Sequence, residues 1–161
     1  MKNTYVNILI ESLEKKSEVL DEVMARDAEQ EMILSAPDPD LDELHDNQEE
    51  IGKLAAELTR LDEGFESLYE KVRSDLLNNK AEYSEEIRVM QDLISEITEK
   101  AVKIGAEEAR HKDRVTNLLR EKRKQLGARR KNINKISTYA NQMNGSTSKQ
   151  NTEPFFVDNK K

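Results

Sequence analysis

The sequence predicts an all-α protein, an elongated antiparallel three-helix bundle or coiled-coil hairpin with a long C-terminal helix. Among 161 residues, 37% are charged and 4% aromatic, and there are only three Pro and five Gly. Apolar residues recur at alternating steps of three and four, which is the heptad spacing of packed helices. The few breaks define helices over about 4–34, 40–78 and 82–140, within one helical domain of residues 1–143.

The first segment begins after Thr4, a residue type that caps helix N-termini well. It ends before Pro37 and Pro39, because proline disfavours helix at its own position and at the residue before it. Lys16 and Asp27 interrupt its apolar row, which otherwise consists of Val6, Leu9, Leu13, Leu20, Val23, Met24 and Ile33.

The second segment begins at Asp40, and Glu43 three residues later completes a capping-box pattern. Asn78 and Asn79 mark its end, because asparagine is tolerated where helices close. One continuous helix over 40–139 remains an alternative. The apolar row of this segment needs cover from the other two helices and consists of Leu44, Ile51, Leu54, Leu58, Leu61, Phe65, Leu68 and Val72.

The third segment is the longest, with an expected length of about 85–90 Å at 1.5 Å per residue. Glu108 and His111 interrupt its heptad row, and apolar residues return at Val115. The two preceding helices are shorter, so we expect the distal half of this helix to lack a full set of intrachain partners. Its proximal row consists of Tyr83, Ile87, Met90, Ile94, Ile97, Ala101 and Ile104.

Residues 144–161 form a polar segment without periodicity, and we expect a disordered C-terminal tail there. Phe155, Phe156 and Val157 are unusual in such a segment, because disordered chains contain few aromatic residues. Two interpretations remain open: a short docking motif, or a segment without a specific role.

Charge is distributed unevenly along the chain, whose net charge is −7. Residues 1–108 hold 12 Lys and Arg against 29 Asp and Glu, a balance of −17. Residues 109–135 hold 11 against 2, a balance of +9. A basic half-helix on an acidic body can pair with its own acidic helices or with an acidic partner.

The distal half of the third helix is the candidate partner-binding site. Beyond Leu118 its apolar positions shift by one residue, to Leu119 and its successors, and they form a stripe bordered by basic residues. Exposed apolar stripes on helices usually mark binding surfaces. Self-association into a homodimeric coiled coil is the alternative. The predicted site consists of Val115, Leu118, Leu119, Lys122, Leu126, Arg130, Ile133, Ile136 and Tyr139.

The residue patterns do not favour an enzyme, a metal site or a cofactor site. The acidic spacing from Asp38 to Glu49 resembles a calcium loop, but Glu43 replaces its glycine, so a helix cap explains it better. His45 and His111 have no His or Cys at ligand spacing, and a packing role is expected for His111. The basic segment lacks stacking aromatics, which disfavours nucleic-acid binding.

No run of about 18 apolar residues is present, so membrane insertion is not expected. The N-terminal apolar run stops at Glu11, which is too early for a signal peptide. Cysteine is absent, which fits a reducing compartment.

Three features resemble the flagellar export chaperones of the FlgN/FliT type, in their Gram-positive, clostridial form. The first is an acidic helical hairpin followed by a long final helix. The second is the run from Asp62 to Val72, DEGFESLYEKV. The third is the ending, in which Thr138-Tyr139 and a polar linker precede FFVDNKK at 155–161.

The resemblance implies a cytoplasmic, non-enzymatic chaperone without a cofactor. Such proteins hold a flagellar hook-associated, junction or cap subunit before type III export, and deliver it to the export gate. The family binds its client through the C-terminal helical region, which corresponds here to Val115–Tyr139. A separate autoinhibitory fourth helix has no counterpart in this sequence.

Overall fold

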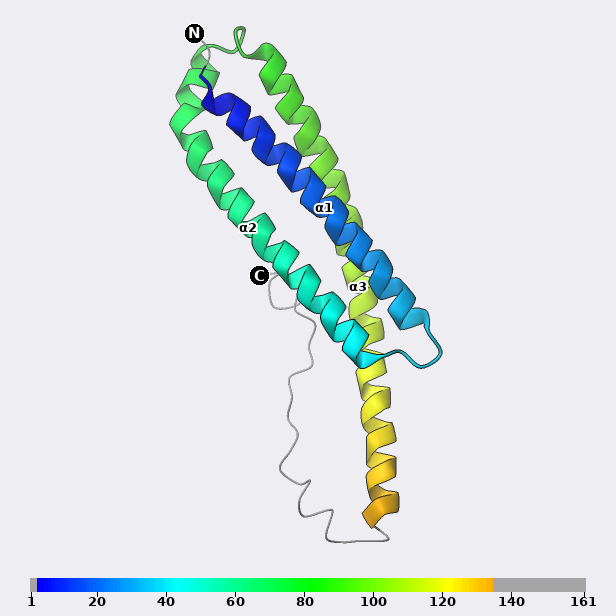
Figure 1. The fold of residues 1–161 in the computed structure, drawn as a ribbon. Helices are drawn as coiled ribbons and strands as arrows, with labels where there is room; N and C mark the ends of the chain where they lie inside the picture. Colours follow the sequence, from blue (N-terminus) through cyan, green and yellow to red (C-terminus); the bar gives the residue numbers. More distant parts are fainter. Residues whose placement is uncertain (1–2, 135–161) are drawn as a thin grey trace. The chain divides into compact units, whose positions relative to one another are not determined.

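The computed structural model describes residues 3–134, which form three helices: α1 (Tyr5–Ser35), α2 (Leu41–Asn78) and α3 (Ser84–Asn134) (Figure 1). The predicted all-α three-helix fold is confirmed, and the described part contains no strand. Residues 135–140 of the expected third helix and the expected tail 144–161 lie outside the described residues.

The chain divides by its internal contacts into two compact units. Unit 1 is Met1–Glu108 and unit 2 is Ala109–Lys161. Helix α3 contributes its first half to unit 1 and its second half to unit 2. The boundary falls where the chain changes from acidic to basic.

Helix α1 begins after Thr4, as the sequence predicts, but the side chain of Thr4 does not provide the capping hydrogen bond. Thr4 has helical dihedrals and makes no side-chain capping bond. The Tyr5 amide instead donates to the side-chain oxygen of Asn3, at 3.0 Å. The helix ends at Ser35, where Ala36 is already extended, as expected ahead of Pro37.

Helix α2 begins with a side-chain cap from Asp40. Its carboxylate accepts from the amides of Asp42 at 2.8 Å and Glu43 at 3.4 Å. These bonds satisfy two of the amides that have no partner within the first helical turn.

Helices α2 and α3 are separate, with residues 79–83 between them. Asn79 closes α2 without the left-handed conformation, at φ −127° and ψ 42°. Its side-chain amide donates to the carbonyl of Asp75 at 3.1 Å. Its own carbonyl accepts from the amides of Glu82 and Tyr83, so one residue satisfies groups on both sides of the break.

Unit 1 is a bundle in which α2 runs antiparallel to α1 and to the first half of α3 (Figure 1). Its core draws on all three helices, and Leu9 and Val72 are fully buried. Burial of a Leu or Val side chain is worth about 1.5–3 kcal/mol. The core cluster consists of Val6, Leu9, Leu13, Leu20, Val23, Val72, Leu76, Tyr83, Met90, Ile97 and Ile104.

Lys100 connects α3 to α1 within unit 1. Its ammonium lies 2.9 Å from the carboxylate of Asp21 and 3.1 Å from that of Glu96. It also donates to the hydroxyl of Ser17 at 2.7 Å. The hydrogen bond with Asp21, followed by that with Glu96, raises the pKa of Lys100 against the opposing effect of burial.

Tyr83 makes a second polar connection at the other end of unit 1. Its hydroxyl oxygen accepts from the Asn3 amide at 2.6 Å, and the hydroxyl donates to the Asp75 carboxylate at 2.9 Å. The Asn3 bond lowers the pKa of Tyr83, but burial and Asp75 outweigh it and raise the pKa above 10.0. The residue that precedes α3 is thereby bonded to Asn3, ahead of α1, and to Asp75 near the end of α2.

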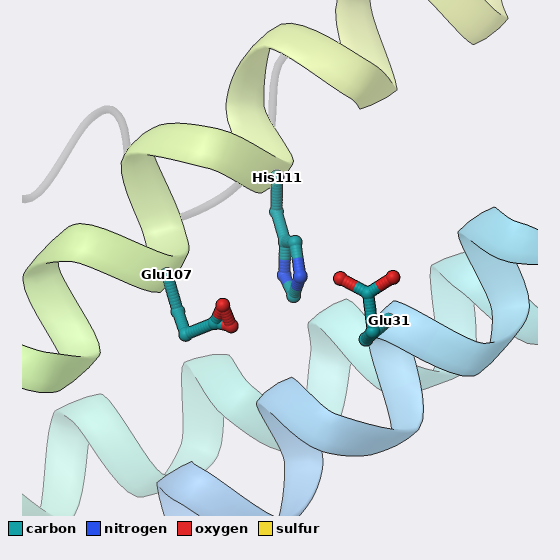
Figure 2. Close-up of side chains that lie close together, drawn as sticks. All are labelled: Glu31, Glu107 and His111. Carbon is teal, nitrogen blue, oxygen red and sulfur yellow. The ribbon is translucent and has the colours of Figure 1, made fainter.

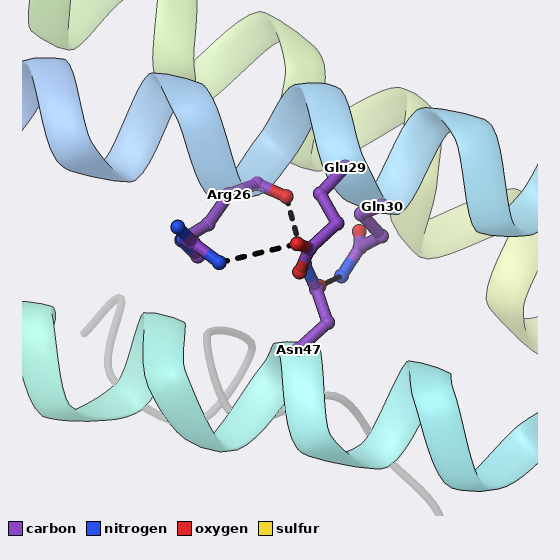
Figure 3. Close-up of polar contacts among 4 residues, drawn as sticks. All are labelled: Arg26, Glu29, Gln30 and Asn47. Atoms are coloured by element: carbon purple, nitrogen blue, oxygen red, sulfur yellow. Dashed lines mark hydrogen bonds and ion pairs between the residues drawn. The ribbon is translucent and has the colours of Figure 1, made fainter.

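A buried polar cluster sets the register of α1 against α2 (Figure 3). Asn47 is 2% exposed. Its side-chain NH₂ donates to the Arg26 carbonyl at 2.8 Å and to Glu29 at 2.9 Å, and its oxygen accepts from Gln30 at 2.8 Å. All three hydrogen bonds can form at only one axial position of α2 along α1. The cluster therefore specifies how these two helices pair.

We predict that Asn47→Ala lowers the free energy of unfolding by about 2 kcal/mol, because it leaves the buried amide of Gln30 without its acceptor. Urea unfolding followed by circular dichroism at 222 nm measures the loss. Asp46→Ala, at the exposed neighbouring position, is the control and should change the value by less than about 0.5 kcal/mol. Equal effects of the two substitutions would contradict the proposed role of Asn47.

Candidate partner-binding helix

The distal half of α3, residues 109–134, carries the candidate site and is the helical part of unit 2. At 1.5 Å per residue it is about 39 Å long. Ala, Leu, Arg, Lys, Glu and Gln, which favour helix strongly, make up most of it. This segment therefore has a high intrinsic tendency to be helical.

The predicted site residues differ in exposure. Val115 is 1% exposed and Leu126 is 51% exposed. Leu118, Leu119 and Lys122 lie between these extremes and are half-buried. The accessible apolar surface therefore begins at Leu118 and increases toward Leu126.

The other four predicted site residues have side chains that lie outside the described part. Arg130 and Ile133 lie within α3, but their side chains are outside the described part. Ile136 and Tyr139 fall outside the described residues altogether. Their roles at the site stay predictions.

The helical positions of the site show which residues share a face. Each residue turns the helix by about 100°, so Val115, Leu119, Lys122 and Leu126 lie within one stripe. Arg129, which is exposed, follows Lys122 by seven residues and falls in the same stripe. The predicted set of site residues does not include Arg129, although its seven-residue spacing from Lys122 could have identified it.

The opposite face of the same segment is polar. Asn117, Arg120, Lys124 and Ala128 are exposed there. The Arg120 guanidinium donates to the side-chain oxygen of Asn117 at 3.4 Å, between neighbours on one helix. This face offers positions for control substitutions that leave the stripe unchanged.

Unit 1 brings two carboxylates together. Glu31 of α1 and Glu107 of α3 have carboxylate oxygens within 4.8 Å of one another (Figure 2). Glu31 also accepts a hydrogen bond from Ser35 at 2.8 Å. Acidic side chains often lie together without a bound ion, so we assign no metal to this pair.

Unit 1 also has a shallow apolar hollow lined in part by Leu13, Phe65 and Ile94. Lys16 and Asp62 line it as well and form an ion pair at 2.6 Å. The side chain of Ile94 is 47% exposed.

Along the described helices, no stretch has the length and hydropathy needed to cross a membrane. A scan against models of protein families, a search of curated proteins and a search of solved structures each found no match. The function must therefore be inferred from the residues of the chain itself.

We predict a division of roles within the stripe. Val115→Ala should lower the free energy of unfolding by about 2 kcal/mol, because it removes methyl groups from a buried site. Leu126→Ala should change it by less than about 0.5 kcal/mol, because that side chain is half exposed. Urea unfolding of the full chain measures both, and a larger loss at Leu126 would contradict the assignment of Leu126 to the accessible surface.

Proposed function

We propose that the protein is a non-enzymatic cytoplasmic chaperone that holds a flagellar hook-associated, junction or cap subunit before its export. The observation that carries the proposal is the distal half of α3, where leucines remain accessible among many basic residues. Leu126 is 51% exposed, while Leu118 and Leu119 are half-buried. The resemblance in layout and in the C-terminal sequence supports the flagellar assignment.

The proposal follows from how amphipathic helices associate. A helical subunit segment that awaits assembly exposes an apolar stripe, which would otherwise pair with further copies of the subunit. An accessible stripe on α3 can cover that segment by side-to-side helix packing. Removal of apolar surface from water contributes about 25 cal/mol per Å², so a few leucines on each side provide useful affinity.

The charge of the site favours an acidic client segment. Residues 109–135 carry a balance of +9. Complementary charge raises the association rate and suppresses wrong partners more than it raises affinity. The leucines would accordingly set how tightly the client is held. The cations would set which client associates with the helix.

We predict that Leu119→Asp combined with Leu126→Asp abolishes client capture while helicity stays close to that of the unchanged protein. Two carboxylates on the stripe would have to be buried on binding, at a cost that exceeds the apolar gain. Co-elution with purified hook-associated, junction and cap subunits of the source organism measures capture. Circular dichroism measures helicity.

Asn117→Asp combined with Ala128→Asp is the matched control, with the same charge change on the opposite face of the helix. It should capture the client as the unchanged protein does. Loss of the whole fold in the stripe variant would assign Leu119 to the core and contradict the proposal. A tight homodimer that binds none of the subunits would favour the coiled-coil alternative instead.

A further inference from the structure

The chain reverses its direction between α2 and α3 within residues 79–83 (Figure 1). Asn79 marks the reversal, because its φ of −127° and ψ of 42° lie outside the helical region. Its amide donates to the Asp75 carbonyl at 3.0 Å, which continues the hydrogen bonding of α2. Its carbonyl accepts from the Tyr83 amide at 3.2 Å, again with the spacing of an α-helix. Helical hydrogen bonding therefore reaches Asn79 from both sides.

The residues of this turn do not require the chain to bend. Residues 78–83 read NNKAEY and include neither proline nor glycine, and no residue of the described part has a positive φ. Lys80 and Ala81 are exposed, and lysine and alanine both favour helix. A change of the backbone at Asn79 and its neighbours into the helical region would therefore join α2 and α3 into one helix.

We infer that two copies of this chain exchange α3 through a hinge at Asn79. In the exchanged dimer, α2 and α3 of each copy form one continuous helix. The first half of α3 then packs against α1 and α2 of the other copy. The partner is thus a second copy of the same chain, and the inference concerns unit 1 and does not rest on the proposed function.

The spacing of contacts around Asn79 is the first reason. The hydroxyl of Tyr83, four residues after Asn79, donates to the carboxylate of Asp75, four residues before it. Ile97 and Leu61, which line the same hollow, lie 18 residues after and 18 residues before the hinge. Two straight helices that cross antiparallel at their hinges place the same residues opposite one another. The contacts of α3 with α2 can therefore form between two copies as they do within one.

The balance of interactions is the second reason. Exchange keeps the buried row of α3 against α1 and α2, so the core loses no apolar burial, and Lys100 meets Asp21 of the other copy. Within the described part, the amides of Lys80 and Ala81 make no backbone hydrogen bond, and a continuous helix gives each an acceptor one turn earlier. The cost is the lost freedom of two molecules, so the dimer should grow with protein concentration.

Pairs of introduced cysteines show which copies are in contact, because the chain has no cysteine of its own. Asp21→Cys combined with Lys100→Cys links α1 to α3, at positions whose side chains lie 2.9 Å apart. Lys16→Cys combined with Asp62→Cys links α1 to α2, at positions whose side chains lie 2.6 Å apart. Exchange moves α3 to the other copy but leaves α2 beside its own α1, so the second pair is the matched control.

Size-exclusion chromatography with light scattering of the concentrated full chain should resolve a dimer beside the monomer. A short bismaleimide is then added to each fraction. In the dimer fraction, the pair at 21 and 100 should give a covalent dimer on a denaturing gel. The control pair at 16 and 62 should give single chains with an internal link in both fractions.

Substitutions of Asn79 test the hinge without changing the core. The side chain of Asn79 donates to the carbonyl of Asp75 at 3.1 Å and to its carboxylate at 2.7 Å. Asn79→Ala removes these bonds and favours helix, whereas Asn79→Gly disfavours helix. The dimerisation constant of the Ala variant should exceed that of the Gly variant at least about tenfold, because each dimer contains two hinges.

Three results would overturn the inference. The first is a chain that stays monomeric at every concentration, both unchanged and as Asn79→Ala. The second is a dimer in which the pair at 21 and 100 links only within one copy, which indicates pairing without exchange. The third is equal dimerisation of the Ala and Gly variants. Each of these results leaves client capture untouched, so the proposed function is decided by its own experiment.

Discussion

Burial of one residue in every seven, from Tyr83 just before α3 through the first half of α3, is the constraint on which unit 1 depends. Tyr83, Met90, Ile97 and Ile104 are each less than 9% exposed. Seven residues turn a helix by about 20° less than two full turns, so this row stays on one face. The row allows α3 to close the core, while Ile94 on the adjoining row remains 47% exposed.

Polar bonds make this docking specific. Apolar rows of similar residues could slide by one heptad at little cost, because burial is not directional. Lys100 and Tyr83 fix α3 against α1 and the end of α2, and Asn47 fixes α2 against α1. These bonds all lie within unit 1. The axial positions of the three helices along one another are therefore set together.

The change of charge and the division into compact units fall at the same place, between Glu108 and Ala109. Unit 1 carries the balance of −17, and residues 109–135 carry +9. An acidic bundle and a basic helix with accessible leucines suit different tasks. In the proposed function, the bundle would support the helix, and the helix would provide attraction and contact area for a partner.

Local signals predicted the helices well, because prolines and caps act on the residues beside them. Asp40 caps α2 as its sequence pattern indicates, whereas Thr4 does not cap α1, because its backbone is already helical. The cluster at Asn47 was not predicted, since it depends on Gln30 of another helix. Heptad spacing from Leu44 could have suggested that Asn47 faces the core.

The site was less predictable than the fold. Periodicity places Val115 and Leu126 on one stripe, but it cannot show that the first is buried and the second half exposed. Exposure depends on tertiary packing, which a repeat pattern does not contain. The position of Arg129 in the stripe follows from its seven-residue spacing from Lys122.

Hydrogen–deuterium exchange of the full chain, with and without a bound flagellar hook-associated, junction or cap subunit, tests the central claim most directly. Amides of residues 109–134 should gain protection in the complex, because partner contact suppresses opening of the helix. Amides in the middle of α2 should exchange as before. New protection confined to α1 and α2, with 109–134 unchanged, would contradict partner binding through distal α3.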